Sequence, residues 1–228
     1  QPIGPPLRTR HIDWASPLAG GPLKAFITLR SFRCLRQVTE LEQRLDLDSD
    51  IVHTGYEGNE SACTTAGRAM TRLQNHEYDL YVVPSRTSDI LAETIRDSVS
   101  QGAGLVIVEG FGRAAHLLHN TPLETISPEH WLLRGVPWDL MPEKLLDRVE
   151  IGTLGQGRVV RLVFPPDTGR VWGLLPTEIG YTAWRNREFE YWEWWELLLA
   201  KACAWAARGA PETQVVIHGP ELSRLQIT

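Results

Sequence analysis

Cysteine is scarce in this chain, with only Cys34, Cys63 and Cys203 among its 228 residues. An odd and widely spaced set without a Cys-x-x-Cys pair predicts neither a disulfide framework nor a zinc site. Cysteine usage therefore does not fix the redox compartment. No apolar run approaches the roughly 20 residues that a bilayer-spanning helix needs, so no membrane insertion is expected.

Basic residues are also sparse, since 23 Lys and Arg stand against 28 Asp and Glu for a net charge of -5. Without a basic block, nucleic-acid binding is not expected. No signal peptide is visible, and the chain starts at Gln1 rather than Met, which suggests a processed or excised piece. We expect a soluble protein, either cytoplasmic or secreted after signal removal.

The length and the 43% hydrophobic content suit one large domain with extensions. Residues 1–23 are rich in Pro and Gly and read as an extended arm. The predicted domain covers 24–210, and 211–228 form a tail or the start of a following domain.

Strands and helices alternate through the first half of the domain. Short apolar runs at 24–29, 50–54, 79–84 and 105–109 predict strands, and helical periodicity predicts helices at 34–45, 65–76 and 89–100. A polar loop is expected at 55–61. This alternation predicts an α/β fold whose mainly parallel central sheet has helices on both faces.

The second half of the chain has a different pattern. Residues 120–148 contain four prolines and predict irregular structure with short helical turns. A hairpin is expected from 150–153 and 158–164 about a Gly-Gln-Gly turn, then a loop over 165–187. A long Trp-rich helix is expected at 189–208, and a strand-like segment at 214–217.

One broad apolar stripe on the 189–208 helix is predicted to cover the sheet. It contains Tyr191, Trp194, Trp195, Leu198, Leu199, Ala202, Trp205 and Ala206. The opposite face, with Glu190, Glu193 and Glu196, is predicted to be solvated. Phe189, Trp192 and Leu197 fall off the stripe and predict a second contact, either with the arm or a neighbouring chain or domain, or with the 165–187 loop.

Four segments carry a resemblance to a known family: Tyr-Asp-Leu-Tyr-Val-Val-Pro at 78–84, Gln-Gly-Ala-Gly-Leu-Val-Ile-Val at 101–108, His-Trp-Leu-Leu-Arg-Gly-Val-Pro at 130–137 and Gly-Gln-Gly-Arg-Val-Val at 155–160. In this order they resemble the class I glutamine amidotransferase-like superfamily, in its non-amidotransferase branches. These branches are the trehalose-utilisation-like proteins and the trimerisation domain of one β-galactosidase family. The resemblance implies a flavodoxin-like three-layer sandwich over roughly 24–208, with a C-terminal hairpin and the long helix.

The chain departs from that superfamily where catalysis would occur. Active members carry a cysteine in Gly-x-Cys-x-Gly at a tight strand-to-helix turn, where backbone N–H groups stabilise the oxyanion. Here the turn after 105–109 reads Gly-Phe-Gly-Arg, no cysteine has flanking glycines, and the His-x-Glu pair is missing. We therefore expect no catalytic residue of this type and no glutaminase activity. The expected role is a non-catalytic accessory or assembly domain of a larger protein, for which a carbohydrate-active enzyme is one candidate.

In open α/β sheets, ligands bind beyond the carboxyl ends of the strands. Arg86, Glu109 and Arg113 lie just past two such ends and are the candidate ligand-binding residues. The alternative is a structural ion pair at the sheet edge. A hydrolase or a small-ligand-binding protein using this cleft is the alternative function.

No cofactor or metal is expected. His116 and His119 are neighbours on a helix face, but a metal site needs further ligands. The expected partners are other domains of the same polypeptide or a homo-oligomer, with a small polar or sugar ligand as a further option.

Overall fold

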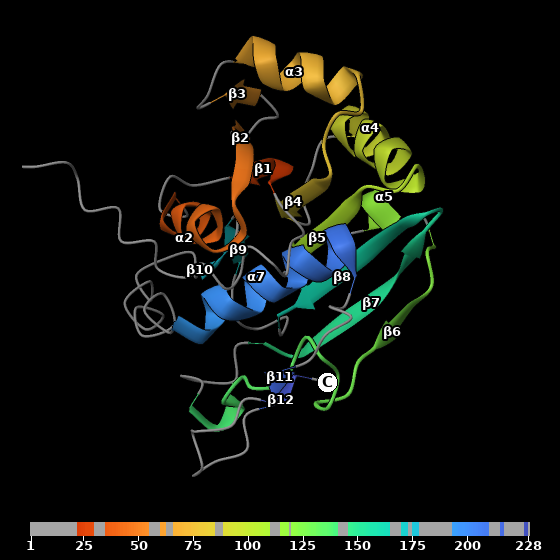
Figure 1. Cartoon of the computed structure of the whole chain (residues 1–228). Coiled ribbons are helices and arrows are strands. Elements are labelled where there is room, and N and C mark those ends of the chain that lie inside the picture. Colours follow the sequence, from red (N-terminus) through yellow and green to blue (C-terminus); the bar gives the residue numbers. More distant parts are fainter. Residues whose placement is uncertain are drawn as a thin grey trace, which may run out of the picture.

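Eight strands form one sheet in the order β3-β2-β1-β4-β5-β8-β7-β6 (Figure 1). The computed structural model describes residues 22–29, 35–54, 60–62, 66–84, 89–109, 115–118, 120–140, 146–164, 170–172, 175–177, 193–209, 215–216 and 226–227. The strands of this sheet are β1 (Leu23–Leu29), β2 (Leu47–Thr54), β3 (Glu60–Ala62), β4 (Leu80–Pro84), β5 (Gly104–Glu109), β6 (Leu123–Thr125), β7 (Arg148–Leu154) and β8 (Gly157–Val163).

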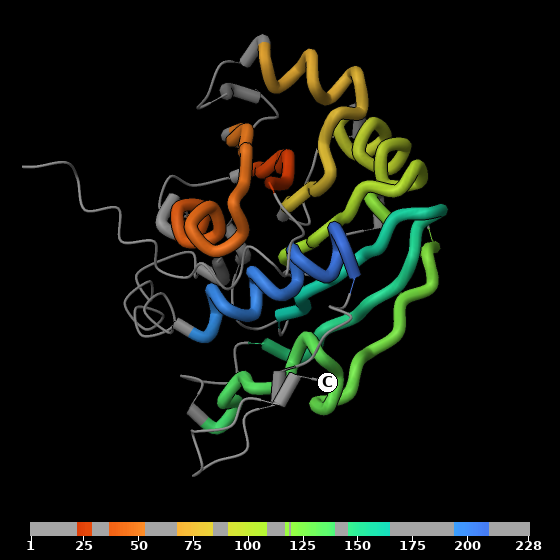
Figure 2. The backbone as a smooth tube through the Cα atoms, viewed as in Figure 1, coloured from red at the N-terminus to blue at the C-terminus, as the bar shows by residue number. Residues whose placement is uncertain are grey.

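The centre of the sheet is parallel, as the alternation of strands and helices predicts. β1 pairs in parallel with both β2 and β4, β4 with β5, and β5 with β8. Antiparallel pairing occurs at the two sides, where β3 joins β2 and where β7 lies between β8 and β6. Figure 2 shows the parts of the chain that contain β6, β7 and β8 running side by side on one side of the molecule.

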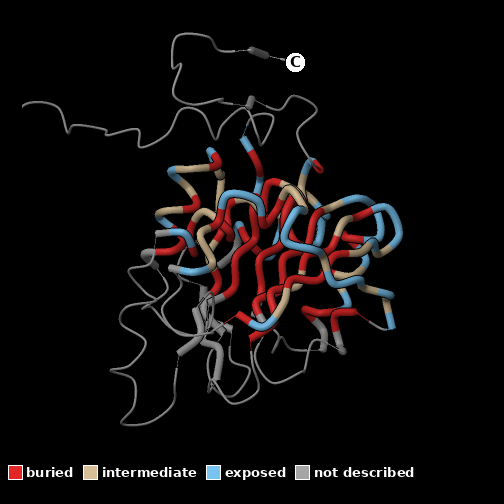
Figure 3. Tube along the Cα trace, turned by 90° about the horizontal axis from the view of Figure 1, so that it is seen from below, coloured by how far each residue is buried: buried red, intermediate tan, exposed pale blue. Residues whose placement is uncertain are grey.

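Helices cover both faces of the sheet, so the fold has three layers. The helices are α2 (Leu35–Leu45), α3 (Ala66–Gln74), α4 (Asp89–Ser100), α5 (Ala115–Leu118) and α7 (Glu193–Arg208), with a 3-10 turn η2 (Trp138–Leu140). Successive residues of a strand point to opposite faces. Accordingly Ala25 and Ile27 of β1 join the core under α2 and α7, whereas Phe26 joins the core under α3, α4 and α5. Figure 3 shows the buried residues gathered in these inner layers.

Several short strands lie where the sequence predicts loop or irregular structure. β3 falls partly in the expected polar loop, and β6 in the proline-containing segment. β9 (Arg170–Trp172) and β10 (Leu175–Thr177) pair within the expected 165–187 loop. Strands of three residues are too short to show a period-2 pattern, and they exist because a neighbouring strand offers its backbone groups.

The predicted hairpin and tail strand are present. β7 and β8 join through a two-residue turn, and the tail forms β11 (Val215–Val216) paired with β12 (Gln226–Ile227). The hairpin turn rests on the end of α4, where the backbone N–H of Gln156 donates to the Ser100 carbonyl at 2.9 Å. A Cβ on Gly157 would lie 2.2 Å from the Val99 carbonyl oxygen, so this approach requires glycine.

The apolar stripe of α7 is confirmed for most of its described members. Trp195, Leu198, Leu199, Ala202 and Ala206 are buried against the sheet. Trp194 is an error of that prediction, because its side of the helix turns outward and leaves the residue 38% exposed. Tyr191, Phe189 and Trp192 lie outside the described residues.

Residues 130–138 contact the C-terminal half of α7, at Lys201 and Trp205. The Lys201 ammonium donates to the Arg134 carbonyl at 2.7 Å and lies 5.0 Å from the centre of the Trp131 ring. His130 packs edge-on against Trp205. Burial, with a smaller effect of Arg134, lowers the pKa of Lys201 to about 8.

Candidate functional site

The carboxyl ends of the parallel strands meet at one edge of the sheet, and α7 begins at that edge. Trp195, the third residue of α7, packs on Phe164 directly after β8, with ring centres 5.5 Å apart. At the other end of the helix, Ala206 lies against Gly104, the first residue of β5. The helix therefore runs antiparallel to the strands, and its first turn lies at the edge where α/β sheets bind ligands.

Among the residues predicted for this site, the structure describes only the backbone of Glu109. Glu109 is the last residue of β5 and pairs with Val163 of β8. Its side chain, Arg86 and Arg113 lie outside the described residues. Whether the three share a cleft stays a prediction.

A charged cluster that sequence reasoning missed lies on the neighbouring strands. Glu150 of β7 is buried and accepts from Arg148 Nε at 2.6 Å and from Arg161 Nη1 at 2.8 Å. Arg148 also pairs with Asp147, and the hydrogen bond to Glu150 is the main reason that the pKa of Arg148 is raised. Among the described residues, two guanidinium groups face two carboxylates in this cluster. The cluster ties β7 to β8.

A second polar pair lies on the opposite face at the same edge, between the first turns of α2 and α7. Gln37 and Glu196 are each 1% exposed, and Gln37 Nε2 donates to Glu196 Oε1 at 3.4 Å. No donor among the described residues reaches Gln37 Oε1. The prediction of a solvated Glu196 is therefore wrong, because α2 packs beside α7 and covers that side of the helix.

The carboxyl end of β1 carries one more buried polar atom. Thr28 is 1% exposed, and within the described part of the chain its hydroxyl has no hydrogen-bond partner. Thr28 is on the α3 and α4 face, because Phe26, two residues before it in the strand, belongs to the core on that face. Polar atoms without described partners thus occur on both faces where β1 ends.

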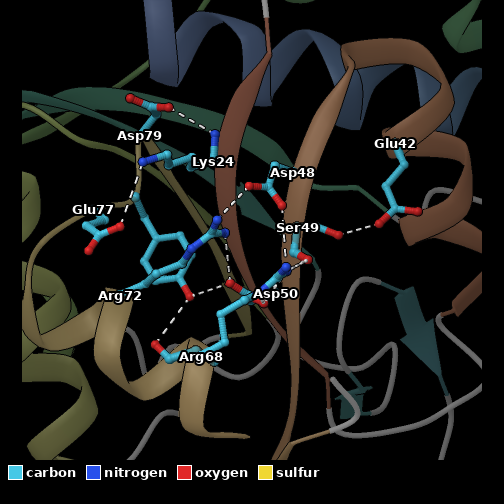
Figure 4. A network of polar contacts seen from close by, with 11 residues as sticks. Lys24, Glu42, Asp48, Ser49, Asp50, Arg68, Arg72, Glu77 and Asp79 are labelled. Atoms are coloured by element: carbon cyan, nitrogen blue, oxygen red, sulfur yellow. Dashed lines mark hydrogen bonds and ion pairs between the residues drawn. The ribbon is translucent and has the colours of Figure 1, made fainter. Parts of the chain in front are cut away.

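Within the described part of the chain, the largest ion-pair network lies toward the amino ends of β1 and β2, away from this edge (Figure 4). Asp50 is fully buried and accepts from Arg68 Nε at 2.7 Å, Arg72 Nη1 at 3.1 Å and the Tyr78 hydroxyl at 2.9 Å. Arg72 also binds Asp48 at 2.8 Å, which lowers the pKa of Asp48. Burial and the bond to Asp50 raise the pKa of Tyr78. This network attaches α3 to β2 and is saturated by its own members.

Cys203 cannot serve as a nucleophile in its present position. Cys203 belongs to α7, and its side chain is fully buried on the inner side of this helix. This burial raises the pKa of its thiol, so the reactive thiolate is disfavoured. Cys34 and Cys63 lie outside the described residues. Across the described ranges, no group of three or more His, Cys, Asp or Glu could hold a metal ion. In those ranges, too, no helix is long and apolar enough to cross a membrane.

Comparison with known proteins assigns no family. No family model matches the chain, and no curated protein matches it. Among solved structures, the chain is similar to one described as the cytoplasmic protein STM3548 from Salmonella typhimurium. The two are 13% identical, the match covers 81% of this chain and 98% of that one, and the TM-score is 0.46. This likeness is too weak to carry an argument about fold or function.

Proposed function

We propose that the chain is a non-catalytic domain of the class I glutamine amidotransferase-like type, with a flavodoxin-like fold. The strand order supports the fold part of the proposal. Counted in chain order, the five parallel strands stand in the sheet as 2-1-3-4-5. This is the order of flavodoxin-like sheets, whose ligands bind at the carboxyl edge beside the first and third strands.

The absence of a cysteine in the sequence that follows β5 supports the functional part of the proposal, which is that the domain is non-catalytic. β5 is a central strand, followed by α5, which is the strand-to-helix arrangement in which an amidotransferase holds its cysteine. Between them the sequence reads Gly110-Phe111-Gly112-Arg113. A phenyl ring supplies neither the attacking sulfur nor a proton, so the covalent step has no nucleophile. An accessory or assembly role in a larger protein, such as a carbohydrate-active enzyme, follows from the resemblance of the sequence.

Ammonia release from glutamine tests the non-catalytic role. We expect no release above the buffer rate, and no change in the Cys203→Ala variant, because the turn after β5 has no cysteine to attack the glutamine amide. Release that disappears on Cys34→Ala or Cys63→Ala would refute the proposal. Sedimentation equilibrium of the purified chain tests assembly, since a homo-oligomer predicts a mass that is a multiple of 25.7 kDa.

A small-ligand-binding protein is the second candidate. The observation that favours it is the buried pair Gln37 and Glu196, which lies at the carboxyl edge where a ligand would bind. This role is compatible with a non-catalytic domain, because binding needs no nucleophile.

A further inference from the structure

We propose that Lys201 is a modification site for carbon dioxide, at which the side-chain amine forms a carbamate. This inference goes beyond the proposed function and does not rest on it. It starts from the scarcity of lysine, because the chain contains only Lys24, Lys144 and Lys201. Lys144 lies outside the described residues, so Lys24 and Lys201 are the two lysine amines whose surroundings can be compared.

Lys201 lies in a cluster of aromatic and polar groups that α7 forms with the segment 130–138. Its side chain is only partly exposed. The amine donates to the Arg134 carbonyl at 2.7 Å and lies 5.0 Å from the centre of the Trp131 ring. Within the described part of the chain, no carboxylate pairs with this amine. Lys201 is therefore held in place without the anionic partner that a surface lysine often has.

Burial keeps part of this amine neutral. Burial, with a smaller effect of the Arg134 charge, lowers the pKa of Lys201 to about 8. The Trp131 ring attracts the charged form, but such an attraction is weaker than the cost of removing an ammonium from water. At about pH 8, roughly half of the amine is therefore neutral, whereas an ordinary lysine with a pKa of about 10.4 is less than about 1% neutral. His130 adds no charge at this pH, because burial, opposed by Glu124 and aided by Lys201, lowers its pKa.

The reaction balances without a further reactant. The lone pair of the neutral amine forms a bond from the Lys201 nitrogen to the carbon of carbon dioxide, and the electrons of one C=O π bond move onto oxygen. The nitrogen then releases one proton to solvent. The product is a carbamate, which places an anionic carboxylate group where the cation was. Carbon dioxide is small enough to reach a partly exposed amine, so the reaction requires no binding cavity.

The charges near Lys201 suit the anionic product. The guanidinium group of Arg134 disfavours a second positive charge at Lys201, and for the same reason it stabilises a carbamate there. Lys24 has the opposite surroundings, because its amine lies 3.8 Å from the Glu77 carboxylate, which repels a carbamate (Figure 4). We therefore expect the carbamate on Lys201 and not on Lys24.

Equilibration of the full chain with isotope-labelled bicarbonate tests the site. Triethyloxonium converts a carbamate into a stable ethyl ester, and peptide mass spectrometry then assigns the ester to a residue. At about pH 8 we expect at least about tenfold more ester on Lys201 than on Lys24, because an amine that is half neutral exceeds an ordinary lysine by more than this factor. In buffer freed of carbon dioxide before trapping, the ester should be absent. The carbamate signal in the carbon NMR spectrum should disappear in Lys201→Arg and persist in Lys24→Arg.

The contribution of Arg134 has its own test. Arg134→Met removes the positive charge and keeps the backbone carbonyl that accepts from Lys201. Loss of this charge leaves less neutral amine and a less stable carbamate, so the Lys201 ester should fall by about threefold or more. Arg96→Met, a matched change on α4 at the opposite face of the sheet, should leave the ester unaltered.

The decisive comparison uses the unmodified chain, so it does not depend on the folding of a variant. Absence of an ester on Lys201 overturns the proposal, and so does equal modification of Lys24 and Lys201. An ester that survives the removal of carbon dioxide overturns the reversible carbamate. An equal yield in Arg134→Met and Arg96→Met overturns the role assigned to the Arg134 charge.

Discussion

At the scale of single residues, Asp50 shows how a buried charge can be tolerated. Its carboxylate is fully buried but is held by Arg68, Arg72 and the Tyr78 hydroxyl, and the arginines keep part of their surface in solvent (Figure 4). Because Asp50 carries the desolvation cost, the loss of stability depends on whether the arginines or Asp50 itself are replaced. Loss of both arginines leaves an uncompensated buried charge.

We therefore expect the Arg68→Met/Arg72→Met double variant to lose about 3–5 kcal/mol of unfolding free energy, measured by urea denaturation. Adding Asp50→Asn removes the unpaired charge and should restore part of that loss. Arg44→Met breaks a single i,i+4 pair with Glu40 and should cost only about 0.3–0.5 kcal/mol. A triple variant less stable than the double would contradict this account.

Residue-scale errors of the sequence prediction come from contacts far apart in the chain. The spacing of Glu190, Glu193 and Glu196 indicates one polar helix face, yet Glu196 is buried by a contact with Gln37, which is 159 residues away. A helical pattern reports the period of a helix, and not the number of neighbours that pack on it. The polar pair at the carboxyl edge could not be found without the packing of α2 beside α7.

At the scale of elements, α7 packs closely on the first residue of β5. A Cβ on Gly104 would lie 2.5 Å from the carbonyl carbon of Ala206 and 2.8 Å from the nitrogen of Ala207. These are backbone atoms and cannot turn aside as a side chain can. The helix must therefore shift as a whole if this residue is enlarged.

Gly104→Ala is expected to lower the unfolding free energy by about 1–3 kcal/mol, the usual cost of overpacking, as measured by chemical denaturation. Adding Ala206→Gly should give no rescue, because the obstructing atoms belong to the backbone. Recovery of stability in that double variant would show instead that the side chain of Ala206 sets the distance.

At the scale of the whole molecule, the parallel sheet was predictable because its strands are buried on both faces. Such strands read as continuous apolar runs, as Tyr81, Val82 and Val83 do in β4. The side strands β3 and β6 lack this signal, since each has three residues and one neighbour in the sheet. The length of a strand and the burial of its two faces together decide whether the strand can be predicted from the sequence.

The same strands supply both cores, and this predicts one cooperative unit. Alternate residues of β1, β4 and β5 enter the clusters on the two faces, so loss of one cluster removes support from the other. Ile95 of α4 is fully buried on one face. Trp131, Trp138, Trp195 and Trp205 all pack on the opposite face.

Ile95→Ala should cost about 2–5 kcal/mol by opening a cavity under α4. Because the sheet couples the two faces, we expect tryptophan fluorescence to report this loss although these four of the nine tryptophans lie on the far side. Thermal curves by fluorescence and by far-ultraviolet circular dichroism should then shift together to a lower Tm. Ile95→Val should shift both curves less, since it removes one methylene. A fluorescence transition that stays in place while the circular dichroism curve moves would mean that the two layers unfold separately.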